Sequence, residues 1–272
     1  MVGKPSGHIF NPSFELIMTD THFKDHFSTG SASYAAHRPT YPLQLVDELA
    51  RISPSTQLAL DCGCGTGQLS VLLAERFARV VATDASAAQI EQAQPRQGVT
   101  YRTALAEDSG LPDASVDLVT VAQAAHWLDL DKFYGEVRRI ARPDAAIALI
   151  TYGVLHVEGE IDELVQHFYY KVIGPYWPAE RRHVEEGYRG LDFPFQERAF
   201  PALEIEVSWK LADLFGYMTT WSAVKAATKA LGTNPLVSFE AQLREQWGNA
   251  EEPKRVTWPL SLRVGNVAIT TE

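Results

Sequence analysis

The sequence has little cysteine: Cys62 and Cys64 are the only two in 272 residues, and a single glycine separates them. With no further cysteine the chain has no disulfide framework, which is typical of proteins from a reducing compartment. Neither thiol has a third or fourth metal-ligating side chain near it in the loop, so the pair does not indicate a metal site. We expect both to be small core residues and predict no bound metal.

The sequence is also short of positive charge. It has 24 Lys and Arg against 34 Asp and Glu, which gives a formal net charge of −10. A surface of that sign repels nucleic acid and anionic membranes, so we expect neither as a partner. The longest apolar stretch, at 145–154, is far too short to span a bilayer, and no basic segment followed by an apolar core marks a signal peptide. We therefore expect a cytoplasmic protein, and the sequence leaves its oligomeric state open.

Short apolar strands alternate with helical patterns in the middle of the chain. A helix is expected at 42–51, and the expected strands are 57–60, 79–83, 99–103, 116–121 and 145–151. Strand and helix alternating in this way predict an α/β fold with a parallel sheet and helices on both faces.

The pattern changes after Tyr152, and this change suggests how the chain is organised. Strands are expected at about 203–209 and 255–264, with helical segments around them. We expect an N-terminal arm at 1–41, a ligand-binding core at 42–155, and a segment at 156–272 that completes the sheet and adds helical inserts. The whole is predicted to be one structural domain whose last strand is antiparallel. The inserts are rich in aromatic residues, which fit either an ordinary core or a lid over an apolar substrate chamber.

The sharpest motif is the run Asp61-Cys-Gly-Cys-Gly-Thr-Gly67, which lies between the first strand and the helix that follows it. Its G-x-G-x-G spacing differs from the G-x-G-x-x-G of dinucleotide folds, because Gln68 stands where the third glycine belongs. Asp61 would repel a pyrophosphate but suits a ligand with an ammonium and a sulfonium group. Asp84 ends the second strand, where a carboxylate accepts hydrogen bonds from ribose hydroxyls. An adenosine that carries an amino acid meets these demands.

With Asp84 and the run Ala104-Leu-Ala-Glu107, this motif resembles the class I S-adenosylmethionine-dependent methyltransferases. The resemblance implies a Rossmann-like sheet of seven mostly parallel strands with an antiparallel last strand, and S-adenosylmethionine as the cofactor. More narrowly, the runs Tyr34–Pro42 and Ala122–Trp127 resemble the small-molecule branch that includes trans-aconitate methyltransferase. One departure is Asp144, since the family usually has glycine in that turn.

The resemblance also implies roles on the methionine side of the cofactor. Gly63 and Gly65 would pass their backbone against the methionine portion, and Asp61 would hold its amino group, directly or through water. Gln123, just past the fourth strand, would face the methionine portion near the reactive methyl group. The alternative for the glycines is a tight turn without a ligand.

On the adenosine side, the resemblance implies that Asp84 binds the ribose and that Ala85 packs on the adenine. Ala106 and Glu107 would lie at the adenine edge. Asp84 has a structural alternative as the N-cap of the helix that follows, and it can fill both roles. Glu107 has the alternative of an ordinary exposed acid.

Three residues are candidates for the acceptor side: His126, Arg38 and Tyr34. His126 follows the strand end that faces the methyl group, and it could act as a general base or orient a carboxylate. Arg38 and Tyr34 offer a guanidinium and a phenol that can bind a carboxylate, although a surface ion pair is the alternative for Arg38.

The sequence therefore predicts an enzyme that transfers a methyl group to a small-molecule acceptor. The narrower hypothesis is O-methylation of a carboxylic acid, because a carboxylate is already deprotonated and needs no base. The alternatives are a hydroxyl or nitrogen acceptor, or a protein that binds the cofactor without catalysis. A nicotinamide oxidoreductase is disfavoured by Gln68.

Overall fold

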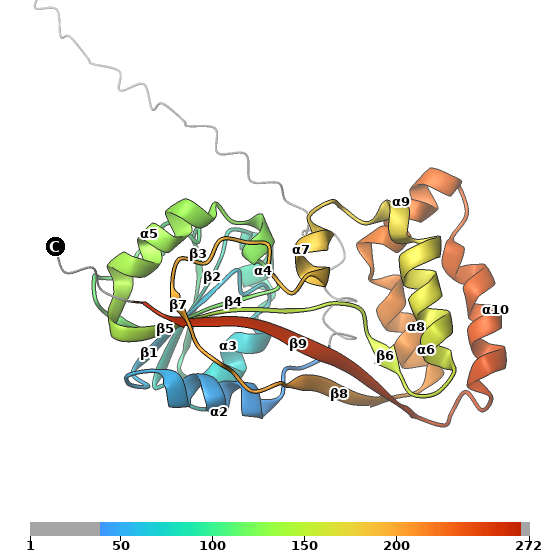
Figure 1. The fold of residues 1–272 in the computed structure, drawn as a ribbon, viewed down its shortest axis with the longest axis horizontal. Coiled ribbons are helices and arrows are strands. Elements are labelled where there is room, and N and C mark those ends of the chain that lie inside the picture. The colour runs from blue at the N-terminus through green and yellow to red at the C-terminus, as the bar shows by residue number, and fades with distance from the viewer. Residues whose placement is uncertain (1–38, 268–272) are drawn as a thin grey trace, which may run out of the picture.

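The structure, a computed structural model, describes residues 39–267, and its centre is one mixed sheet (Figure 1). The strand order is β3-β2-β1-β4-β5-β9-β6, and β7 and β8 also pair with β9. The strands are β1 (Leu58–Cys62), β2 (Arg79–Asp84), β3 (Val99–Thr103), β4 (Val116–Ala122), β5 (Ala141–Tyr152), β6 (His156–Val157), β7 (Gln196–Glu197), β8 (Glu204–Trp209) and β9 (Lys254–Asn266).

The sheet is parallel from β3 to β5. Strands β1, β2, β4 and β5 are largely buried on both faces, whereas the edge strand β3 is largely exposed. Its helices are α2 (Leu43–Ile52), α3 (Gln68–Leu73), α4 (Ala87–Glu91) and α5 (Leu130–Ile140). Alternate residues of β1 separate two cores: Ala59 packs in the core that contains Leu45 of α2, and Leu60 packs in the core that contains Val137 of α5. A strand buried on both faces has to be apolar throughout, and for this reason the strands read as continuous apolar runs.

The antiparallel edge is built on the long strand β9. Residues 260–266 of β9 pair with 146–152 of β5, and residues 254–259 pair with β8. The short strands β6 and β7 add to the same strand. β9 therefore belongs to the sheet at one end and leads to the helical inserts at the other (Figure 1).

The inserts form a helical unit that faces the carboxyl ends of the parallel strands (Figure 1). Its elements are α6 (Ile161–His167), η2 (Phe168–Val172), η3 (Gly174–Tyr176), α8 (Leu211–Thr219), α9 (Ser222–Leu231) and α10 (Pro235–Trp247). The chain between η3 and α8 also forms the helix α7 (Arg181–Glu185). Aromatic side chains make much of its core: the rings of Phe168 and Phe239 stack at 4.2 Å, and Tyr169 meets Trp221 edge-on at 5.4 Å. The short helix α7 lies between this unit and the sheet (Figure 1).

The predicted fold class is confirmed, with two differences of detail. Within residues 39–267 the sheet has nine strands in place of seven, because β6 and β7 are additional strands of two residues each. Asp144 has a φ of +62°, the left-handed conformation that glycine adopts most readily, so the turn keeps its shape without the family's glycine. No helix in the described part of the chain is long and apolar enough to cross a membrane. The same residues hold no cluster of three or more His, Cys, Asp or Glu arranged around a metal position.

Candidate functional site

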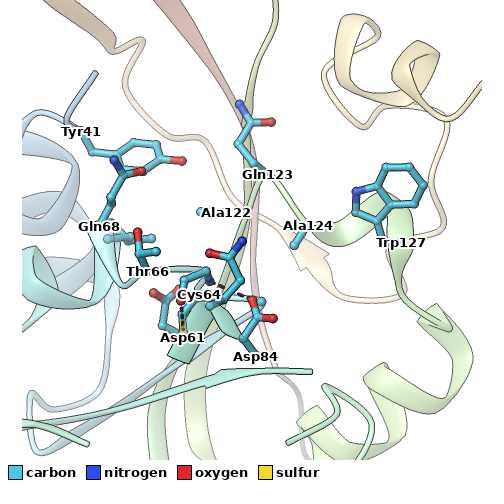
Figure 2. A pocket seen from close by; sticks show the side chains of 14 residues that line it. Tyr41, Asp61, Cys64, Thr66, Gln68, Asp84, Ala122, Gln123, Ala124 and Trp127 are labelled. Atoms are coloured by element: carbon cyan, nitrogen blue, oxygen red, sulfur yellow. Dashed lines mark hydrogen bonds between the residues drawn. The ribbon is translucent and has the colours of Figure 1, made fainter. Parts of the chain in front are cut away.

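A pocket lies at the carboxyl ends of β1, β2 and β4, where ligands bind in open parallel sheets (Figure 2). About 680 Å³ of empty space lies within it, part of which is open to solvent. Its lining residues are Tyr41, Asp61, Gly63, Cys64, Gly65, Thr66, Gln68, Leu69, Asp84, Gln89, Ala122, Gln123, Ala124 and Trp127. The predicted residues Asp61, Gly63, Gly65, Asp84 and Gln123 are thus brought together.

The glycine loop between β1 and α3 holds three glycines in the left-handed conformation, which glycine adopts most readily. Gly63, Gly65 and Gly67 have φ values of +62°, +56° and +85°. A Cβ on Gly63 would lie 2.6 Å from the Cβ of Ala124, and one on Gly67 would overlap the ring of Tyr101. On Gly65 a Cβ would meet only the side-chain oxygen of Gln89, at 3.8 Å, and would project into the pocket. Gly65 is therefore the glycine that leaves room for a ligand, while the other two allow close packing of the chain.

Asp84 links the loop to the next helix. Its carboxylate accepts a hydrogen bond from the backbone N–H of Gly65 at 2.8 Å and another from the N–H of Ser86 at 2.9 Å. Ser86 is the N-cap residue of α4 and makes no side-chain cap, so Asp84 holds the residue that precedes the helix without itself capping the first turn. Each carboxylate oxygen has a second lone pair, so Asp84 still has acceptor capacity on the pocket side.

Asp61 is a buried carboxylate held by two hydroxyl groups. Ser70 of α3 donates to one oxygen at 2.6 Å, and Thr120 of β4 donates to the other at 2.8 Å. Burial raises the pKa of Asp61 to about 6, and the nearby Asp84 adds to the rise, while the two hydroxyls oppose it. Asp61 is only 1% exposed, so its charge acts on a ligand in the pocket mainly through long-range electrostatics.

The chemistry of this lining fits S-adenosylmethionine. The lining residues include two carboxylates, Asp61 and Asp84, and neither lysine nor arginine among residues 39–267 lines this pocket. Such a pocket favours a ligand with an ammonium and a sulfonium group and disfavours a pyrophosphate. Gly65 leaves space for a ligand beside the backbone, and Asp84 can accept hydrogen bonds from a diol.

The other predicted cofactor residues lie farther out. Ala85 and Glu107 are half-buried, Ala106 is buried, and none of the three is among the residues that line this pocket. Glu107 accepts a hydrogen bond from the backbone N–H of Asp129, 3.1 Å away. Their roles at the adenine stay predictions.

Gln123 lines the pocket but turns its amide away from Asp84 (Figure 2). Its amide nitrogen donates to the carbonyl oxygen of Tyr152 at 3.0 Å, and its amide oxygen accepts from the hydroxyl of Thr151 at 2.9 Å. Its φ is +59°, which fixes this tight departure from β4. Gln123 therefore ties the end of β4 to the end of β5, in addition to any contact with the cofactor.

His126 lies beside the pocket, in the short helical turn η1 (Ala125–Trp127). It is half-buried, and its Nδ1 shares a hydrogen bond of 2.9 Å with the hydroxyl of Tyr188. Burial, with the positive charges of Arg181 and His183 nearby, lowers the pKa of His126 to about 3. The ring is therefore neutral near pH 7. The other two acceptor-side candidates, Arg38 and Tyr34, lie outside the described residues.

Sequence reasoning missed the groups that hold Asp61 and the cations near His126. Thr120 pairs with Asp61 in the register of β1 and β4, and a threonine inside the apolar run of β4 was the available signal. Ser70 comes nine residues after Asp61, on the buried face of α3. Arg181 and His183 belong to a five-residue helix with no recognisable motif.

Comparison with known proteins agrees with this geometry. The family described as "Methyltransferase domain" matches residues 60–149, the segment that carries the glycine loop, Asp84 and β4. A protein of Dictyostelium discoideum named "Putative methyltransferase" is 37% identical over 218 residues, which cover 79% of this chain and 83% of that protein. The protein of Saccharomyces cerevisiae named "Probable S-adenosylmethionine-dependent methyltransferase CRG1" is 34% identical over 131 residues, 45% of each chain.

A solved structure from Anaeromyxobacter dehalogenans is similar over nearly its whole length. It is described as a "Putative Type II Methyltransferase" and is 49% identical to this chain, with a TM-score of 0.82. The match covers 85% of this chain and 98% of that one, so it includes the helical unit as well as the sheet.

Proposed function

We propose that this chain, which belongs to the class I S-adenosylmethionine-dependent methyltransferases, transfers the methyl group to a small-molecule acceptor, and that this acceptor is a carboxylic acid. The cofactor of the enzyme is S-adenosylmethionine. When bound, it supplies a methyl group on a sulfonium. An acceptor atom attacks the methyl carbon in line, and the carbon–sulfur bond breaks to leave S-adenosylhomocysteine. The chain's own part is to position the two reactants and to exclude water.

Three side chains of the pocket have a part in that positioning. Asp84 accepts hydrogen bonds from the ribose hydroxyls while it holds the N–H of Gly65, so the loop and the ligand are aligned by the same carboxylate. The negative charges of Asp61 and Asp84 stabilise the positively charged ligand more than the neutral product. Gln123 fixes the ends of β4 and β5 around the acceptor side of the pocket.

The observation that carries the acceptor class is the state of His126. A hydroxyl or an ammonium acceptor has to lose a proton, and a histidine whose pKa is lowered by burial to about 3 is a poor base at neutral pH. A carboxylate acceptor arrives already deprotonated and needs no base, so a neutral histidine beside it has only to donate a hydrogen bond. Neutral His126 beside the pocket supports this class, and the net charge of −10 speaks against a nucleic acid.

Both cysteines are free thiols, which supports a reducing compartment such as the cytoplasm.

The test is incubation of the protein with methyl-labelled S-adenosylmethionine and a panel of small metabolites, followed by mass spectrometry. We expect label in methyl esters. Label on nitrogen, on an alcohol oxygen or on a ring carbon would refute the carboxylate and keep the methyltransferase. Tight binding of S-adenosylhomocysteine without any labelled product would indicate a cofactor-binding protein without catalysis.

A further inference from the structure

Arg181 is a half-buried cation without a directly bound carboxylate. Its Nε donates to the hydroxyl of Tyr169 at 2.7 Å, and its guanidinium carbon lies 4.9 Å from the centre of the Trp177 ring. Among residues 39–267 no carboxylate oxygen lies within 4.0 Å of its nitrogens, whereas the next residue, Arg182, pairs with Glu186 at 3.7 Å. Arginine keeps its charge in any protein setting. The negative charge of Glu185 acts on this guanidinium from beyond ion-pair distance, so Arg181 brings a positive charge with no direct ion pair under the helical unit.

Two hydrogen-bonding atoms in this region have no partner either, one in the ring that the guanidinium faces and one two residues farther along α7. In the described part of the chain, the Nε1 of Trp177 and the Nδ1 of His183 are buried and make no hydrogen bond. Buried polar atoms in folded proteins are nearly always satisfied, so such a pair beside a cation indicates a binding site for a ligand with acceptor oxygens. The terminal nitrogens of Arg181, which make no hydrogen bond to described residues, can hold a carboxylate with two parallel bonds.

The cation is also close to the place where the methyl group is transferred. Arg181 and His183 lie near enough to His126 for their charges to act on its pKa. His126 in turn lies between the pocket-lining residues Ala124 and Trp127. α7, which begins with Arg181, lies between the sheet and the helical unit (Figure 1). A ligand held at Arg181 therefore lies on the acceptor side of the cofactor pocket.

The surroundings of Arg181 indicate what the rest of the ligand is like. Tyr169 packs on Trp177 at 4.9 Å and on Trp221 at 5.4 Å, and Tyr217 lies 5.8 Å from Trp221. Aromatic walls around a single cation suit a ligand with an apolar body and one anionic group.

We propose that Arg181 binds a carboxylate of the methyl acceptor, with Trp177 and His183 as additional N–H donors, and that the aromatic walls hold an apolar body. This inference rests on the proposed function, since it names the group that recognises the acceptor. It also places acceptor recognition on α7, in a part of the chain where the sequence shows no motif.

The test compares carboxylic acids with their uncharged amides. The protein is saturated with S-adenosylhomocysteine and titrated with benzoate, phenylacetate and indole-3-acetate and with the three corresponding primary amides. The variants are Arg181→Gln and the matched control Arg182→Gln, which removes a neighbouring exposed arginine. We expect at least one acid to bind about tenfold more tightly than its amide, a preference that Arg181→Gln loses and Arg182→Gln keeps. The affinity for S-adenosylhomocysteine stays within about twofold in both variants.

Equal binding of acids and amides, no binding of any probe, or an acid preference that persists in Arg181→Gln would overturn the proposal. If Arg181→Gln fails to fold, Arg181→Lys serves in its place: it keeps the charge but loses the planar fork, so the preference should fall without vanishing. The same probes with methyl-labelled cofactor separate the two proposals. Acids that bind with the expected preference, while the label in the metabolite panel goes to nitrogen, an alcohol oxygen or carbon, leave the Arg181 site standing and refute the methylation of carboxylates. A labelled acid whose KM is unchanged in Arg181→Gln supports the methylation of carboxylates and refutes the Arg181 site.

Discussion

Replacement of Asp61 by asparagine should stabilise the protein while it weakens cofactor binding. The buried carboxylate has a pKa of about 6 in the folded chain, against 3.8 for an ordinary aspartate, because burial disfavours its charged form. Above pH 6 the folded state therefore holds a charge that would be solvated in the unfolded chain. The difference between these two pKa values corresponds to about 3 kcal/mol at pH 7 and above, since each pKa unit is worth about 1.36 kcal/mol.

The sign of the pH dependence follows from proton binding. Between pH 3.8 and 6 the folded chain binds more protons at Asp61 than the unfolded chain, so the stability of the wild type falls as the pH rises. The asparagine of the D61N variant does not titrate. We compare the free energy of unfolding of D61N with that of the wild type at each pH. This difference should increase by about 2–3 kcal/mol from pH 4 to pH 7. Weaker hydrogen bonds to Ser70 and Thr120 should lower the stability of D61N by a small amount at every pH.

The assay is urea unfolding without cofactor at several pH values, with Asp117→Asn as the matched control. Asp117 is just as buried, but it pairs with Arg142 at 3.0 Å and accepts the backbone N–H groups of Gln57 and Leu58. D117N should therefore destabilise the chain by roughly 1–3 kcal/mol at pH 7, because Arg142 and the two backbone N–H groups lose a charged acceptor. Titration with S-adenosylhomocysteine completes the experiment: binding to the wild type should weaken below pH 6, and D61N should bind weakly at every pH. A stability difference that stays flat from pH 4 to pH 7 would refute the reasoning.

Four further outcomes are expected. Asp84→Ala should weaken S-adenosylhomocysteine binding by about 1–3 kcal/mol, measured by calorimetry, and unchanged binding in a folded variant would reject the ribose role. Gly65→Ala should lose about tenfold or more in the same affinity, whereas Gly232→Ala, at a similar positive φ but with open space around it, should lose only stability. With saturating cofactor, His126→Gln should lower the rate without changing the shape of its pH profile between about pH 5 and 8; a limb near neutrality that disappears in the variant would make His126 a base. NAD should compete with S-adenosylhomocysteine only weakly, and displacement at equal concentration would contradict the pocket's charge.

The parts of the site that the sequence predicted are those in which local chemistry and strand order determine position. Asp61 and Asp84 end or nearly end neighbouring parallel strands, so the fold must bring them together whatever the side chains around them do. Gln123 was predicted to face the cofactor, and this role stays a prediction. Its side chain also donates one hydrogen bond to the end of β5 and accepts another from it, which a local pattern cannot show because that strand end lies 29 residues away.

The helical unit shows the same limit more strongly. Its aromatic residues were visible in the sequence, but their period did not distinguish a core from a lid, and many of them pack on one another. Arg181 was not predicted because its significance lies in what is missing around it. An arginine without a direct ion pair looks like any other arginine until the neighbouring chain segments have been placed.

The position of β9 has a consequence for how the chain assembles. β9 follows every other described strand in the sequence, and yet it pairs with β5, β6, β7 and β8. During synthesis the parallel part of the sheet, β1 to β5, can form early. The edge of β5 stays open and apolar until more than a hundred further residues have left the ribosome. The nascent chain thus passes through a stage in which that edge can pair with another copy. Chaperone dependence should concentrate in this stage, and the yield of properly assembled protein should be sensitive to the rate of translation between β5 and β9.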